Sequence, residues 1–205
     1  SSTGTAVAEC FNILKKSWNI PAVKVVAPFY NHPGYIKAYV TLIKEKQQQT
    51  KDWEHLIFSY HGLPERHIIK SEGEENLCKR TQPCPKNNVS NYCYRAQCYE
   101  SSRLMASQLS LSEDQYTVCF QSRLGRTPWI HPYTDDVLKK LREKGIKRIG
   151  VVCPSFVIDC LETLQEIGME ALEDWVSLGG ENLSLVPCLN ASKQWLDAVW
   201  DIAET

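Results

Sequence analysis

Short β-branched runs alternate with longer amphipathic stretches along most of the 205-residue chain. The β-branched runs predict strands at residues 23–26, 55–59, 116–120, 148–152 and 183–186. The amphipathic stretches predict helices at residues 7–18, 33–45, 94–109, 134–144, 159–175 and 192–203. Alternating strands and helices are typical of an α/β protein, so we expect a mostly parallel sheet covered by helices on both faces.

Three loops that follow predicted strands are rich in polar and aromatic residues. They are SYHGLP at residues 59–64, QSRLGRTPW at 121–129 and CPSF at 153–156. In sheets of this kind the binding crevice lies at the carboxyl ends of the strands. These loops are therefore the first place to look for a functional site.

His61 follows an apolar strand and precedes a Gly-Leu-Pro turn. An imidazole held there could transfer protons near neutral pH or bind a metal through a neutral nitrogen. A capping or core histidine that is hydrogen-bonded to backbone is the ordinary alternative, and one motif does not separate the two.

Asp159, Glu162 and Glu166 are spaced three and then four residues apart, which places them along one face of a helix. Such a row could pass protons or hard cations. The row continues through Glu170 and Glu173, so the pattern alone favours a solvated amphipathic face. Only Asp159 and Glu162 fall in the first turn beyond a strand end, where the crevice is expected.

The loop at residues 121–129 carries Arg123, Arg126 and Trp129. A flat indole can pack against a planar apolar ligand while guanidinium groups bind carboxylates. An ordinary polar loop with one anchoring tryptophan is the alternative.

Four cysteines, Cys78, Cys84, Cys93 and Cys98, fall within a span of 21 residues. They lie in or just beyond residues 62–92, where no core periodicity is evident and a long polar loop is expected. Four thiolates suit zinc or an iron–sulfur cluster, but the C-x5-C-x8-C-x4-C spacing matches neither zinc ribbons nor ferredoxins.

Composition and charge narrow the class of protein. Hydrophobic residues make up 43% of the chain, charged residues 23%, and the net charge is -1, which gives no reason to expect a nucleic-acid partner. No apolar stretch is long enough to span a bilayer, so a cytoplasmic chain is expected. The opening SSTGT lacks Met and predicts that further sequence precedes it.

Several motifs resemble those of the ferrochelatases. FSYHGLP at 58–64 resembles the strand-end motif with the family's catalytic histidine, and FQSRLGRTPW at 120–129 resembles its QS-x-x-G-x-x-PW stretch. PSFVIDCLETL at 154–164 resembles its P-x-F-x-x-D-x-x-E-T-L signature, and Leu189-Asn190 also matches. The matches run in order over nearly the whole chain.

The resemblance implies a three-layer, chelatase-like (Rossmann-like) α/β fold and a metal chelatase, a lyase that inserts Fe2+ into protoporphyrin IX to form protoheme. It implies that His61 and Glu162 face each other across the porphyrin as catalytic and substrate-iron residues, without assigning protons or metal to either. One alternative is a related chelatase that inserts cobalt or nickel into another tetrapyrrole. The other is a non-catalytic module that binds an iron–sulfur cluster or zinc. The implied metal or proton path adds Asp159 and Glu166, and the implied porphyrin pocket contains Trp129, Phe156, Ser122 and Arg123.

The resemblance also bears on the cysteines and on domain organisation. Members with four cysteines in an internal segment carry a 2Fe-2S cluster, so Cys78, Cys84, Cys93 and Cys98 are expected to hold one, with zinc as the second choice. Residues 1–205 would form the C-terminal half, with a cysteine-rich insertion at about 71–98. The N-terminal half would complete the pocket, so this chain alone is expected to be inactive or impaired. A peripheral membrane contact and a coproporphyrin-type substrate are compatible with the family.

Overall fold

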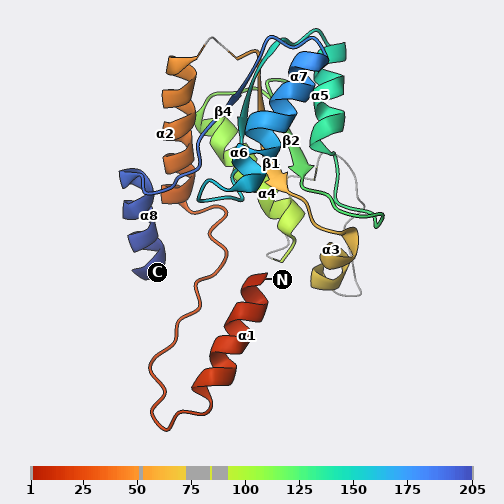
Figure 1. Cartoon of the computed structure of the whole chain (residues 1–205). Coiled ribbons are helices and arrows are strands. Elements are labelled where there is room, and N and C mark those ends of the chain that lie inside the picture. The colour runs from red at the N-terminus through yellow and green to blue at the C-terminus, as the bar shows by residue number, and fades with distance from the viewer. Residues whose placement is uncertain (1, 51–52, 73–83, 85–91, 205) are drawn as a thin grey trace.

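The computed structural model describes residues 2–50, 53–72, 84 and 92–204. Within these residues the strands form one parallel sheet in the order β2-β1-β3-β4 (Figure 1). This sheet confirms the predicted strands at 55–59, 116–120, 148–152 and 183–186. The bounds are His55–His61 for β1, Tyr116–Gln121 for β2, Arg148–Val152 for β3 and Asn182–Leu185 for β4.

Two helices, α2 (Pro33–Gln49) and α4 (Tyr94–Gln108), cover one face of the sheet, and α8 (Lys193–Glu204) packs against α2. The core on this face includes alternate residues of β1, namely Leu56, Phe58 and Tyr60. Side chains alternate between the two faces along a strand, so Ile57 points to the opposite layer.

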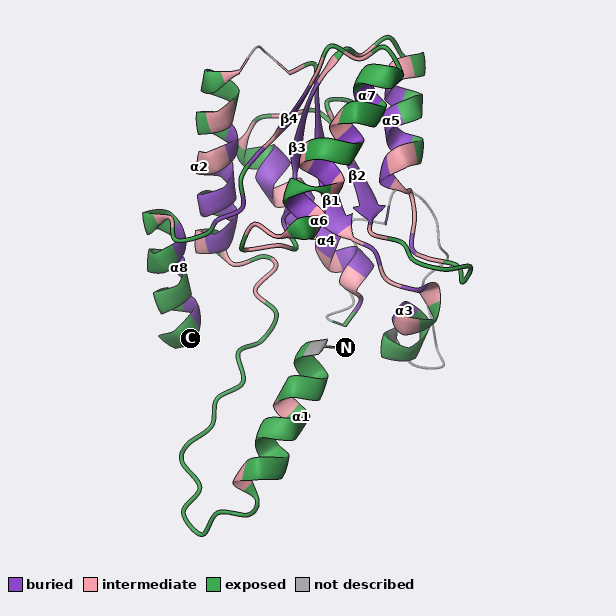
Figure 2. Ribbon diagram, viewed as in Figure 1, coloured by how far each residue is buried: buried purple, intermediate pink, exposed green. Residues whose placement is uncertain are grey.

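The opposite face is covered by α5 (Thr134–Glu143), the π-helical segment η1 (Glu166–Ala171) and α7 (Leu172–Ser177). Trp175 of α7 is fully buried in this layer and donates its indole N–H to the carbonyl of Lys147 at 3.1 Å. Figure 2 shows the buried strands between the two helical layers, as expected for a three-layer α/β fold.

The predicted helix at residues 159–175 is divided. A short helix, α6 (Leu161–Leu164), is followed by η1 and then by α7. The change occurs at Gln165, whose carbonyl accepts from both Met169 N–H (3.1 Å) and Glu170 N–H (2.9 Å), the second being a five-residue bond. A π segment of this kind is not detectable from a hydrophobic pattern, and it often marks a functional site.

Two further predictions were wrong. Residues 23–26 form no strand, because this segment pairs with no strand in the described chain and its valines are exposed. Part of the expected loop after Gly62 is helical, as α3 (Glu65–Glu72), with Ile68 as its buried contact. The first helix, α1 (Ser2–Leu14), lies apart from the sheet, and almost all of its described residues are exposed (Figures 1 and 2).

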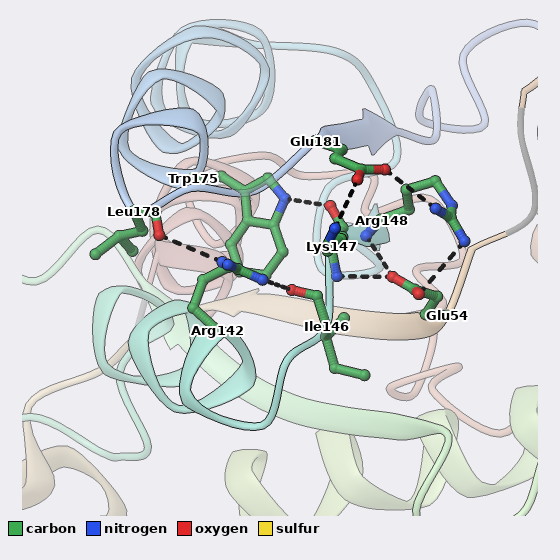
Figure 3. A network of polar contacts seen from close by, with 8 residues as sticks. All are labelled: Glu54, Arg142, Ile146, Lys147, Arg148, Trp175, Leu178 and Glu181. Carbon is green, nitrogen blue, oxygen red and sulfur yellow. Dashed lines mark hydrogen bonds and ion pairs between the residues drawn. The ribbon is translucent and has the colours of Figure 1, made fainter.

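A polar network joins the loops that precede β1, β3 and β4 (Figure 3). Glu54 accepts from the backbone N–H groups of Lys147 and Arg148 at 2.7 and 2.8 Å, and Arg148 forms an ion pair with Glu181 at 3.1 Å. Partly exposed ion pairs stabilise a fold little, so the backbone hydrogen bonds are the main fixing contacts. The network lies at the amino ends of the strands, away from the crevice edge. None of the described helices is long and apolar enough to cross a membrane.

His55, the first residue of β1, makes stability depend on pH. Burial, together with the nearby charge of Lys144, lowers its pKa from 6.5 to about 4. Below pH 6.5 His55 binds a proton in the unfolded chain but not in the folded chain. The contribution of His55 to the free energy of unfolding is therefore full above pH 6.5 and falls as the pH is lowered toward 4. We expect the wild type to lose on the order of 1–2 kcal/mol more than His55→Gln between pH 7.5 and 5, measured by urea unfolding.

His67→Gln is the matched control, because His67 is only partly buried and lies on α3, outside the sheet. It should follow the wild type at both pH values. Equal pH dependence of the wild type and His55→Gln would show that His55 is not held neutral.

Candidate active site

His61 is the last residue of β1 and lies at the carboxyl edge of the sheet. Its backbone N–H donates to Ser155 Oγ at 3.0 Å, and its carbonyl accepts from Tyr94 Oη at 2.9 Å. The next backbone N–H, from Gly62, donates to the carbonyl of Gln121 at 2.8 Å. The histidine is therefore fixed through its main chain on both sides.

The hydrogen bond of the His61 ring assigns its tautomer. Nδ1 lies 2.6 Å from the carbonyl oxygen of Gly62. A carbonyl oxygen only accepts, so Nδ1 must carry the proton. In the neutral ring Nε2 then holds the free electron pair, which can take a proton or bind a cation.

Two aromatic rings from other strand-end loops lie beside His61. The ring centroid of Trp129 is 6.4 Å from that of His61, and the centroid of Phe156 is 6.0 Å away. Trp129 is held by its indole N–H, which donates to the carbonyl of Leu124 at 2.9 Å, and by backbone pairing with Pro64. Two predicted pocket residues thus lie next to the predicted catalytic histidine.

Glu162 lies on α6, half-buried, on the same side of the molecule. Its own backbone N–H and the Cys160 thiol hydrogen-bond the carboxylate and lower its pKa, and the charge of His61 lowers it further. The carboxylate is therefore ionised at neutral pH, and it is close enough to His61 to interact with it electrostatically.

Gln121 is a site residue that the sequence did not single out by itself. The side chain is 3% exposed at the end of β2. Its Oε1 accepts from Ser59 Oγ at 2.7 Å, and its Nε2 donates to the Glu162 carbonyl at 2.6 Å and to Glu166 Oε2 at 3.2 Å. A polar residue at the buried end of a strand was the available signal, because a buried amide needs partners.

Glu166, in the first turn of η1, binds the residue after β2. Ser122 donates to it through the backbone N–H at 2.6 Å and through the hydroxyl at 2.5 Å. Ser122 adopts a left-handed backbone with φ of 61°, which costs energy for a residue other than glycine and is typical of functional sites. The carboxylate of Glu166 is thus held at the end of β2.

Asp159 lies before α6, so it does not share a helix face with Glu162 and Glu166 as the spacing predicted. Its carboxylate accepts from the Cys188 N–H at 2.9 Å and from the Asn190 side-chain amide at 2.7 Å. Burial raises its pKa, but these hydrogen bonds outweigh burial and lower it overall. Asp159 holds the loop after β3 against residues 188–190.

Arg123 is exposed and directed toward α5. Its guanidinium forms an ion pair with Asp135 at 2.8 Å and lies 4.3 Å from the centroid of the Tyr133 ring. It therefore lies at the rim, next to Ser122, and does not reach the His61 ring group by any described contact.

Three of the four clustered cysteines, Cys84, Cys93 and Cys98, are described and buried, and Cys78 lies outside the described residues. Burial raises the pKa of the Cys98 thiol, while a hydrogen bond with Tyr94 and the nearby Arg95 lower it. Among the residues that the structure describes, no three or more His, Cys, Asp or Glu side chains form a metal-binding group.

The whole chain, residues 1–205, matches the protein-family model described as Ferrochelatase. A ferrochelatase of Legionella pneumophila strain Philadelphia 1 is 49% identical over 202 residues, which cover 98% of this chain and 60% of that protein. A ferrochelatase of Coxiella burnetii strain Dugway 5J108-111 is 47% identical over 204 residues, covering 99% and 57% respectively. The chain spans about 60% of the length of the curated relatives it matches.

Gly62 tests the packing of the site. A Cβ at this position would lie 2.9 Å from the Gln121 carbonyl and 3.2 Å from the Trp129 ring. We expect Gly62→Ala to displace Trp129 and to destabilise the fold by about 1–3 kcal/mol in urea unfolding. Gly4→Ala is the control, because nothing lies within 4 Å of its Cβ. Equal stability of the two variants would contradict the close approach.

Proposed function

The chain belongs to the ferrochelatase family, and we propose that its site serves the insertion of ferrous iron into protoporphyrin IX to form protoheme. We further propose that residues 1–205 act as the C-terminal half of the enzyme and that an N-terminal half completes the pocket. The expectation of impaired activity in this chain alone, its location in the cytoplasm and a peripheral membrane contact stay predictions.

One observation carries the proposal: a histidine with a defined tautomer lies beside two aromatic rings at the sheet edge. The Nδ1 proton is bound to the Gly62 carbonyl, and Trp129 and Phe156 lie beside the ring. A planar porphyrin needs flat apolar contacts, and its pyrrole N–H groups need a base. Nε2 of His61 has the free electron pair for that step.

We assign proton removal to His61 and iron binding to Glu162. An imidazole accepts protons efficiently near neutral pH. A carboxylate whose pKa is lowered is a weaker base but stays ionised, which suits a ligand for a divalent cation. Glu162 lies close enough to His61 for the two side chains to act on the same substrate.

We propose supporting roles for the remaining site residues. Glu166 borders a cleft that Glu170 and Asp174 also line, so it can take part in a path for protons or iron. Asp159, through its bonds to residues 188–190, acts on the loop that precedes Glu162. We propose that Ser122 and Arg123 lie at the rim of the pocket and bind the carboxylates of the porphyrin.

We propose that Cys78, Cys84, Cys93 and Cys98 hold a 2Fe-2S cluster, with structural zinc as the second choice. Cys84, Cys93 and Cys98 are all buried in the core on the α4 side of the sheet, and Arg95 beside Cys98 is 4% exposed. A buried cation next to thiols suits an anionic thiolate-ligated centre. Such a cluster would supply redox-active iron.

Substitution of His61 tests the catalytic assignment in the full-length protein. We expect His61→Ala to lower kcat for iron insertion into protoporphyrin by about 100-fold or more, because it removes the proton acceptor. His67→Ala on α3 should retain wild-type kcat. Iron insertion at the wild-type rate by His61→Ala would refute the catalytic assignment. If the wild type inserted cobalt or nickel into another tetrapyrrole and no iron into protoporphyrin, the proposed substrate would be wrong.

Substitution of Cys98 tests the metal centre. We expect the purified wild type to contain iron and acid-labile sulfide and to show the visible spectrum of a 2Fe-2S cluster, and Cys98→Ser to lose both. Cys119→Ser is the matched control, since this buried thiol lies on β2 outside the cysteine-rich segment. Zinc without sulfide in the wild type would contradict the cluster.

A further inference from the structure

Three tyrosine hydroxyls from two helices donate to main-chain carbonyls of the loops that carry His61 and Phe156. Tyr35 and Tyr39 belong to α2, and Tyr94 is the first residue of α4. Both helices cover the same face of the sheet. None of these tyrosines belongs to the motifs that indicated the site.

The α2 tyrosines hold the loop that follows β3. Tyr35 Oη donates to the Pro154 carbonyl at 2.6 Å, and Tyr39 Oη donates to the Phe156 carbonyl at 2.6 Å. The two residues are one helical turn apart, and their rings pack edge to face with centroids 5.3 Å apart. The loop after β3 is therefore bound to α2 at two carbonyls, one on each side of Ser155.

Tyr94 and Ser155 connect this loop to His61. Tyr94 Oη donates to the His61 carbonyl at 2.9 Å, while the His61 N–H donates to Ser155 Oγ at 3.0 Å. Both polar groups of the His61 main chain are thus bound by side chains, one from α4 and one from the loop after β3. A displacement of either support would move the imidazole relative to Phe156.

The phenols are suited to a fixed donor role. Tyr35 and Tyr39 are 4% and 0% exposed, and burial raises the pKa values of both. Each hydroxyl therefore keeps its proton at the pH values where the enzyme would work. A buried carbonyl that loses such a donor has no water to replace it.

We infer that Tyr35, Tyr39 and Tyr94 are positioning residues, which set the imidazole of His61 and the ring of Phe156 at the spacing that the porphyrin requires. This inference rests on the proposed function, because the site's substrate defines what spacing is required. The tyrosines act through main-chain carbonyls and touch no reacting atom.

Loss of the Tyr94 hydroxyl and loss of the Tyr39 hydroxyl should have different kinetic effects. Tyr94 supports His61, so its loss should reduce the rate of proton removal. Tyr39 supports Phe156, which packs against the porphyrin, so its loss should weaken porphyrin binding. A general loss of folding would instead change kcat and the amount of active enzyme together.

The test uses Tyr94→Phe and Tyr39→Phe in the full-length protein, with Tyr60→Phe as the matched control. Tyr60 lies on β1, is 3% exposed, and shares its hydroxyl with Ser102 at 2.9 Å rather than with the site. We expect Tyr94→Phe to lower kcat about 10-fold with KM for protoporphyrin within about 2-fold, and Tyr39→Phe to raise KM about 10-fold. Tyr60→Phe should leave both constants within about 2-fold of the wild type.

Nitrogen-15 NMR of the His61 imidazole gives a second reading that does not need turnover. We expect Tyr94→Phe to shift or broaden the Nδ1–H signal, and Tyr60→Phe to leave it unchanged. Identical kinetics and His61 spectra in Tyr94→Phe and Tyr60→Phe would overturn the inference. A wild type that does not insert iron would refute the proposed function alone, because the His61 signal would still report whether Tyr94 positions the ring.

Discussion

The buried amide of Gln121 is the contact on which the site depends most. Its oxygen binds Ser59 of β1, while its nitrogen binds the main chain of Glu162 and the carboxylate of Glu166. An amide buried at 3% exposure is costly unless all its groups are paired. The strand ends and the first turns of the divided helix are therefore fixed by one side chain.

The parallel register of β1 and β2 brings the residues that follow both strands to the Gln121 contact. His61 pairs with Gln121 at the ends of β1 and β2, so the chain leaves both strands at the same edge. The residues that follow then meet in space: Gly62 bonds to Gln121, and Trp129 returns to pair with Pro64. Residues far apart in the sequence form one aromatic and imidazole group because parallel strands end together.

Much of this arrangement could be predicted from the sequence, and the failures have physical causes. The strand at 55–59 and the histidine after it were predictable, since burial and strand ends leave clear patterns. The break at Gln165 was not, because a five-residue hydrogen bond changes no hydrophobic periodicity. Tyr35 and Tyr39 fit core positions of an amphipathic helix, and only their hydroxyl partners in another segment reveal a second role.

The carboxylates show why spacing alone misleads at such a site. Three acids at helical intervals predicted one row. In the structure Asp159 comes before α6 begins, and the helix changes to π geometry between Glu162 and the residues that follow Gln165. Each carboxylate therefore accepts from different donors. Asp159 accepts from the N–H of Cys188, Glu162 from its own N–H, and Glu166 from the N–H of Ser122 after β2. Hydrogen bonds from its own N–H and from the Cys160 thiol lower the pKa of Glu162 and keep it ionised near His61, which is why we propose iron binding there.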